Sequence, residues 1–311
     1  MASVNVTSAY VGNVEDTIFT LTVVGNQAVE KGSVYVEPGV QKALYLPRFN
    51  TGVDQLQASK ATPLTGDASD SYTYNERSIT PLDAMFYDEF NPRNFEDVWR
   101  EFQPVGPLVD RVDNPRIQSA IISGAVQSVG TQLGKLIWQG DIGGGTPALE
   151  FFDGFLKILP AGGAIAPTPA GVITAANVIS ILEATEAAIP DTVYEDPNVY
   201  FHMSTADLRL YKEAARALDF KGPNISEAGD DMFAGRGIRS YSGMKKDWIV
   251  VAKATAGKDS NLWAAVDTSS DDVNPKIART QANSELFFIK ILLKYAVNSP
   301  NPTETVVYAP A

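Results

Sequence analysis

The strongest constraint on the fold is an apolar stripe between residues 114 and 138. Asn114 can cap a helix, and Pro115 suits a first helical turn, where its missing N–H costs nothing. Apolar residues then recur every four positions, which predicts one unbroken helix of about 37 Å. The stripe consists of Ile117, Ile121, Ala125, Val129, Leu133 and Ile137, flanked by Ala120, Val126 and Leu136.

A second face of this helix is also nearly neutral, because Arg116 and Lys135 are its only charged residues. Gly124, Gly130 and Gly134 would each weaken an isolated helix by about 1 kcal/mol. We expect these glycines to let another element approach closely. A helix of this kind needs a sheet on one side and further partners on another.

Residues 37–82 predict a long two-stranded ribbon. The segments 43–49 and 71–79 have strand character, and about twenty polar residues separate them. Such a loop is unusual inside a compact domain, and an isolated ribbon is marginal in water, so we expect a neighbouring subunit to cover it. The candidate intersubunit contacts on the ribbon are Arg48, Phe49, Tyr72, Tyr74, Glu76 and Arg77.

The remaining pattern predicts an N-terminal arm and an α/β layer. Residues 1–36 are rich in β-branched residues and favour one or two short strands, while 94–102 favours a short helix. Residues 286–296 alternate like a strand, with an apolar helix as the alternative. After the Gly- and Pro-rich run 160–171 we expect a helix from Thr174 to Pro190 and then a strand over 199–203. A second helix is expected over 204–218, with Ser204 and Asp207 as its capping box. Further strands are expected over 248–252, 262–266 and 305–308.

The composition excludes several kinds of chemistry. There is no Cys, which removes disulfides, thiolate nucleophiles and cysteine zinc sites, and His202 is the only histidine. The net charge of −12 argues against a basic surface that grips duplex nucleic acid. No cationic leader precedes an apolar run, and the most apolar stretch is too short for a bilayer, which favours a soluble protein.

No motif in the sequence predicts catalysis, a cofactor or a metal. His202 sits in an apolar strand and is expected to be structural. Residues 140–146 resemble a phosphate loop only superficially, because Thr146 stands where a Lys is required. The acidic doublets at 195–196, 230–231 and 271–272 lack the spacing of a calcium loop. The one basic cluster is either a contact for an acidic neighbour or a solvated loop, and it contains Arg236, Arg239, Lys245 and Lys246.

The order of parts resembles the major capsid protein of tailed phages, which has the Hong Kong 97 fold. The helix 114–138 looks like the spine helix of that family, and the phrases at 152–156, 198–209 and 252–267 resemble segments of its later strands and helices. Residues 286–297 look like the long strand of its peripheral domain. The resemblance covers nearly the whole chain, although no single motif is diagnostic.

The resemblance implies an α+β chain with a defined division. Residues 1–36 would form the N-terminal arm and 37–82 the extended loop. Residues 83–160 and 274–300 would form the peripheral domain, and 161–273 with 301–311 the α/β axial domain.

The implied function is self-assembly, through hexamers and pentamers, into an icosahedral shell around double-stranded DNA. The expected location is the virion capsid, assembled in the host cytoplasm, with portal, scaffolding or decoration proteins as partners and no cofactor, enzyme activity or membrane. One alternative with the same fold is an encapsulin-type compartment that encloses cargo enzymes. A less favoured alternative is an acidic α/β hydrolase or lyase that uses His202.

Overall fold

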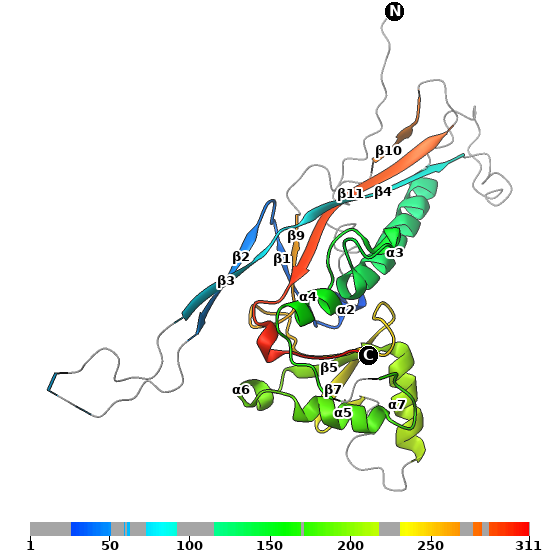
Figure 1. The fold of residues 1–311 in the computed structure, drawn as a ribbon. Helices are drawn as coiled ribbons and strands as arrows, with labels where there is room; N and C mark the ends of the chain where they lie inside the picture. Colours follow the sequence, from blue (N-terminus) through cyan, green and yellow to red (C-terminus); the bar gives the residue numbers. More distant parts are fainter. Residues whose placement is uncertain are drawn as a thin grey trace, which may run out of the picture.

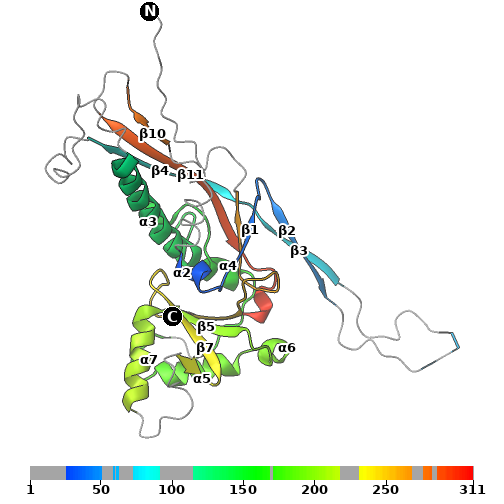
Figure 2. The same ribbon diagram turned by 180° about the vertical axis from the view of Figure 1, so that it is seen from behind.

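The computed structural model describes residues 26–50, 59, 61–62, 73–91, 115–168, 171–217, 231–267, 276–281 and 286–310. It contains two five-stranded sheets and a two-stranded ribbon, with the long helix α3 (Pro115–Gln139) running along one sheet toward the other (Figure 1). The ribbon projects sideways from the body, and the same outline is seen from behind (Figure 2). The predicted long helix is confirmed.

The first sheet is built around the long strand β11 (Phe287–Asn298). β4 (Leu82–Phe90) pairs with one edge of β11, and β10 (Lys276–Arg279) and β9 (Trp263–Val266) pair with the other edge. β1 (Tyr35–Pro38) lies parallel to β9. The strand predicted over 286–296 is confirmed and the helix alternative is wrong, because alternate residues of β11 are buried against α3.

The second sheet forms the predicted α/β layer. Its strands, in order, are β12 (Val306–Tyr308), β8 (Ile249–Lys253), β5 (Val199–Ser204), β7 (Arg236–Tyr241) and β6 (Met232–Phe233). Helices α5 (Val178–Ala187) and α7 (Thr205–Ala217) pack on one face in one apolar cluster. The other face packs against the end of α3 and α4 (Phe155–Ala161).

Ser204 caps α7 as predicted, and Asp207 bonds back to the Ser204 hydroxyl and not to its backbone N–H as a full capping box would. The Ser204 Oγ accepts a hydrogen bond from the Asp207 backbone N–H at 3.1 Å and donates one to Asp207 Oδ2 at 2.7 Å. Asp207 Oδ2 also accepts the backbone N–H of Asp247 at 3.0 Å. These bonds tie the start of α7 to the turn before β8.

The shorter helices are α2 (Gln27–Glu30) and α6 (Asp191–Tyr194), with 3₁₀ turns at Pro147–Leu149 and Pro302–Glu304.

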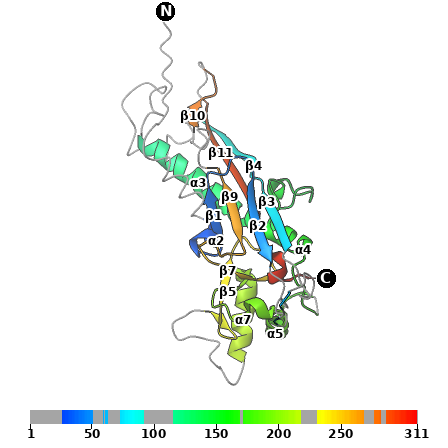
Figure 3. The same ribbon diagram turned by 90° about the vertical axis from the view of Figure 1, so that its left-hand side faces the viewer.

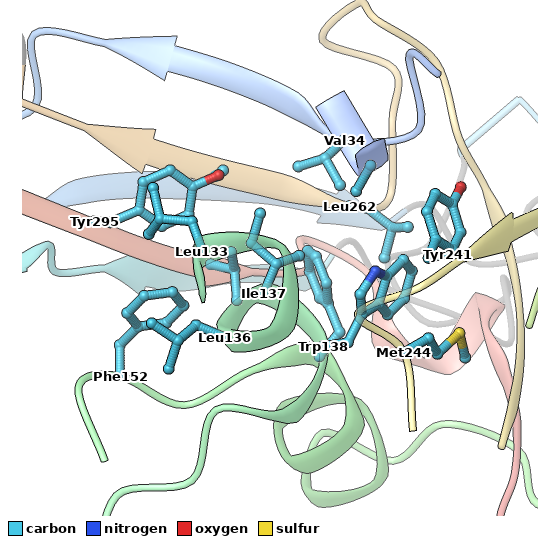
Figure 4. Packing of buried hydrophobic residues seen from close by; sticks show 14 of the residues in the cluster. Val34, Leu133, Leu136, Ile137, Trp138, Phe152, Tyr241, Met244, Leu262 and Tyr295 are labelled. Carbon is cyan, nitrogen blue, oxygen red and sulfur yellow. The ribbon is translucent and has the colours of Figure 1, made fainter. Parts of the chain in front are cut away.

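The C-terminal half of α3 forms the main core (Figure 4). Leu133, Leu136 and Ile137 are buried, as the stripe predicts, between β11 and the second sheet. Trp138 is fully buried, with its ring centre 5.0 Å from that of Tyr241 in β7. The aromatic residues at this end of α3 thus join the two sheets.

The expected close approach is confirmed at Gly134 and is wrong at Gly124, where a Cβ would meet nothing within 4 Å. A Cβ at Gly134 would lie 3.6 Å from Asn26 Oδ1, and a Cβ at Gly243 would lie 2.2 Å from the Gly134 carbonyl oxygen. The second distance is far too short for a real contact. Gly243 therefore lets the turn after β7 rest directly on the backbone of α3.

Some sequence-based assignments differ from the structure. Residues 27–30 form a short helix that the sequence did not predict, and Asn26 caps it by accepting the Ala28 N–H. Strand β9 was assigned to the axial segment 161–273, yet it pairs with β1 and β11 in the first sheet. The strands expected within 1–25 and the helix expected over 94–102 lie outside the described residues.

Candidate intersubunit interface

The register of the ribbon sorts its side chains onto two faces. β2 (Leu44–Asn50) pairs antiparallel with β3 (Thr73–Ile79), and Leu46 lies opposite Arg77 while Phe49 lies opposite Tyr74. Directly opposite residues in such a pair share one face. Leu46, Arg48, Arg77 and Ile79 therefore share one face, and Tyr45, Pro47, Tyr74 and Glu76 share the other.

The first face attaches the root of the ribbon to its own chain. Leu46 and Ile79 are buried in an apolar cluster with Ala265 and Ala296 of the first sheet. Arg48 lies 3.7 Å from the Glu304 carboxylate, with both side chains about one third exposed. Burial lowers the pKa of Arg77 on the same face. The ion pair of Arg48 is thus made within the chain, whereas the sequence alone had suggested Arg48 and Arg77 for contacts between subunits.

The second face of the ribbon is open. Tyr45 and Tyr74 are each 61% exposed, and the Tyr74 hydroxyl donates to the exposed Glu76 carboxylate at 3.5 Å. A fully covered tyrosine side chain buries about 150–250 Å² and tyrosine is enriched at protein interfaces; at 61% exposure each of these two residues leaves roughly 90–150 Å² uncovered. Figure 3, turned by 90°, shows β2 and β3 lying beside the first sheet. Of the remaining candidate contacts, Phe49 pairs with Tyr74 in the backbone register. Tyr72 lies outside the described residues.

The outward face of the first sheet is a second exposed surface, which the sequence analysis missed. Met85 is 52% and Tyr87 46% exposed, and the Tyr87 ring stacks on Phe288 at 5.8 Å. Lys294 lies 3.5 Å from Asp83 on the same face. Side chains alternate between two faces along residues 82–90, and this pattern could have predicted the surface. Which face is exposed follows only from the pairing of β4 with β11, some two hundred residues away in the chain.

His202 is a structural residue. It is fully buried, its Nδ1 lies 2.9 Å from the Tyr241 hydroxyl, and its ring lies 5.7 Å from that of Trp138. Burial, helped by the nearby charges of Arg239 and Lys31, lowers the pKa of His202 to about 3. A neutral imidazole without access to solvent cannot reach a substrate as a general base. The hydrolase alternative therefore loses its proposed residue.

Two members of the basic cluster, Arg236 and Arg239, are held by contacts within the chain, whereas Lys245 and Lys246 are exposed. Arg236 stacks on Tyr194 at 4.6 Å and donates to the Tyr194 and Asp196 carbonyls. Arg239 stacks on Tyr200 at 3.6 Å and donates to Ser33 Oγ at 2.7 Å. Both guanidinium groups thus hold loops onto the second sheet.

The described residues offer neither a metal site nor a membrane-spanning helix. Within the described ranges no group of His, Asp and Glu side chains is placed to hold a metal ion. Among the helices described, none has the length and apolar character needed to cross a membrane.

Solved structures resemble this chain in fold, although its sequence matches no family model or curated protein. No protein-family model matches the chain, and no curated protein is significantly similar to it in sequence. A chain of the satellite phage P4 procapsid superposes with a TM-score of 0.58 at 12% identity, covering 94% of this chain and 98% of that one. A chain from the capsid of an empty GTA particle gives 0.56 at 12% identity, with 92% and 90% covered, and one from the capsid of Myoviridae phage XM1 gives 0.57 at 9%, with 92% of each covered.

The chain has the fold of phage capsid proteins. The predicted capsid fold is therefore confirmed at the level of the whole α/β chain, since the match runs over nearly the full length of both partners. The roles of individual segments as arm, extended loop, spine helix and axial domain stay predictions.

Proposed function

We propose that this chain is a major capsid protein that self-assembles, through hexamers and pentamers, into the icosahedral shell of a tailed bacteriophage. The capsid fold over the full chain length carries this proposal. The projecting ribbon supports it, because its open tyrosine face has no cover within the described part of the chain. A structural role without catalysis is consistent with the burial of His202.

The proposed roles of the individual segments follow from the two exposed surfaces. The ribbon within 37–82 acts as the extended loop and binds a neighbouring subunit through the face that carries Tyr45, Tyr74 and Glu76. The first sheet and α3 form the peripheral domain, and the second sheet forms the axial domain. The outward face of β4 and β11, which exposes Met85 and Tyr87, is a second surface for such a neighbour.

The proposed shell encloses double-stranded DNA without binding it specifically. Each copy carries a net charge of −12, and Arg236 and Arg239 are held by internal contacts. Like charges on many copies repel, so assembly depends on apolar and shape-complementary contacts. Portal, scaffolding or decoration proteins would be partners of this shell, which forms in the host cytoplasm and becomes the virion capsid.

The test is the oligomeric state of the purified chain. Size-exclusion chromatography with light scattering, followed by negative-stain imaging, is expected to show capsomers or closed shells. A monodisperse 33.5 kDa monomer at all protein and salt concentrations would refute the proposal. The contents of shells formed in the native host separate a virion from an enzyme compartment: DNA supports the proposal, and a packaged enzyme contradicts it.

A further inference from the structure

The glycine-rich loop that follows α3 exposes an isoleucine. Residues 142–148 are all exposed, and Ile142 is 46% exposed. Single exposed apolar residues are common on protein surfaces and do not by themselves mark an interface. Ile142 differs from such residues in the way in which its own chain holds its backbone.

Both backbone groups of Ile142 are bound by side chains at the start of α4. The Ile142 N–H donates to Asp153 Oδ1 at 2.8 Å, and the Ile142 carbonyl accepts a hydrogen bond from Lys157 Nζ at 2.9 Å. Lys157 Nζ also lies 2.7 Å from Asp141 Oδ1 and 2.7 Å from Asp153 Oδ1. The bonds to these two carboxylates raise the pKa of Lys157, so its ammonium group keeps its charge. The backbone of Ile142 is therefore fixed, while its side chain stays exposed.

The far end of the loop is fixed as well. The Gly145 N–H donates to Glu150 Oε1 at 2.7 Å, and the Ala148 carbonyl accepts from Gln132 Nε2 of α3 at 3.2 Å. Gly143 and Gly145 have φ values of 83° and 75°, which only glycine adopts readily. A loop that is already ordered loses less conformational entropy when it binds a partner than a loop that is not.

The charge of the loop indicates which kind of partner fits. Residues 142–148 contain no charged side chain, and Asp141 and Asp153 at the base of the loop are paired with Lys157. The whole chain carries a net charge of −12, so two copies that meet through charged surfaces repel each other. A neutral loop avoids this repulsion and offers nothing that selects a charged ligand. It therefore suits a second copy of the chain.

We propose that loop 142–148 is a contact between copies of this chain, with Ile142 as its apolar anchor and Lys157 as the residue that positions the anchor. This inference rests on the proposed function, because it needs a second copy. It adds a third contact surface to the ribbon and to the outward face of the first sheet.

The variant Ile142→Ser tests the anchor, and Val172→Ser is its matched control. Val172 is another exposed β-branched residue, at 57%, and lies before α5. Because both sites are exposed, the unfolding midpoint is expected to stay unchanged in both variants. The protein concentration needed for half-maximal assembly is expected to rise about three- to tenfold for Ile142→Ser, the factor for covering roughly half of an isoleucine side chain. It is expected to stay within about twofold of the wild type for Val172→Ser.

The variant Lys157→Met tests the positioning role, since it keeps an unbranched side chain and removes the ammonium group that holds the Ile142 carbonyl. Lys157→Met is expected to impair assembly, and the double variant with Ile142→Ser is expected to be no worse than Ile142→Ser alone. A purely structural Lys157 would instead give losses that add in the double variant, and that result would overturn its positioning role.

A side-chain-resolution map of wild-type shells completes the test, and it is expected to show the Ile142 side chain against a neighbouring copy. The inference is overturned if Ile142 faces solvent or a different protein in that map, or if Ile142→Ser and Val172→Ser assemble equally well. Either result with wild-type shells present leaves the proposed function standing. A wild-type chain that stays monomeric at all concentrations refutes the proposed function and this inference together.

Discussion

The burial of His202 predicts that acid destabilises the folded chain in a way that one substitution removes. The imidazole is fully buried beside Trp138 and Tyr241, and the positive charges of Arg239 and Lys31 add to the cost of protonating it. Its pKa is about 3 in the folded chain, against an ordinary value of 6.5. Below pH 6.5 the unfolded chain therefore binds a proton that the folded chain does not.

The size of the effect follows from this difference in pKa. Stability contributed by the neutral form is complete above pH 6.5 and falls by about 1.4 kcal/mol for each pH unit below it, until the folded pKa is reached. At about pH 5 the loss is about 2 kcal/mol. Burial raises the pKa of Asp207, which acts in the opposite direction at lower pH, so the wild-type curve alone does not isolate His202.

The assay compares wild type with His202→Gln, which keeps a polar partner for the Tyr241 hydroxyl and does not titrate. The free energy of unfolding of unassembled protein is measured by denaturant titration between about pH 7 and pH 4.5. Asp207 and the other carboxyl groups contribute equally to both proteins and cancel in the difference. The wild type is expected to lose about 1.4 kcal/mol more per pH unit than the variant below pH 6.5. Parallel curves for the two proteins would refute the reasoning, whatever the constant offset between them.

Three other predictions concern packing, assembly and charge. Gly243→Ala would place a Cβ 2.2 Å from the Gly134 carbonyl oxygen and is expected to lower the free energy of unfolding by about 1–3 kcal/mol. Gly124→Ala, whose Cβ would meet nothing within 4 Å, is expected to raise it by about 1 kcal/mol. Equal effects of the two substitutions would contradict the close contact at Gly243. Tyr74→Ser, at a site 61% exposed, is expected to leave the unfolding midpoint unchanged while reducing the yield of shells, and normal assembly would show that this face is not an interface. Purified protein mixed with duplex DNA at low salt is expected not to bind, because the net charge is −12; binding with a steep salt dependence would contradict this.

The elements with a strong local period were predictable from the sequence. Apolar residues at intervals of four predicted α3, and the alternation of side chains over 287–298 predicted β11. Ser204 with Asp207 predicted the start of α7. Each of these signals depends only on neighbours a few residues away, which fix one face of a helix or strand. The structural role of His202 followed in the same way from the apolar strand around it.

The contacts between distant segments were decided only by the tertiary structure. Strand β9 follows β8 closely in the chain but joins the other sheet, and the sequence of β9 carries no record of which partner it pairs with. All of the ribbon residues named above stay candidates for contacts between subunits, but only the ribbon register separates Arg48 and Arg77, which face their own chain, from Tyr74 and Glu76, which face outward. A strand's pattern states which residues share a face, whereas the partner that covers that face depends on packing between segments far apart in sequence.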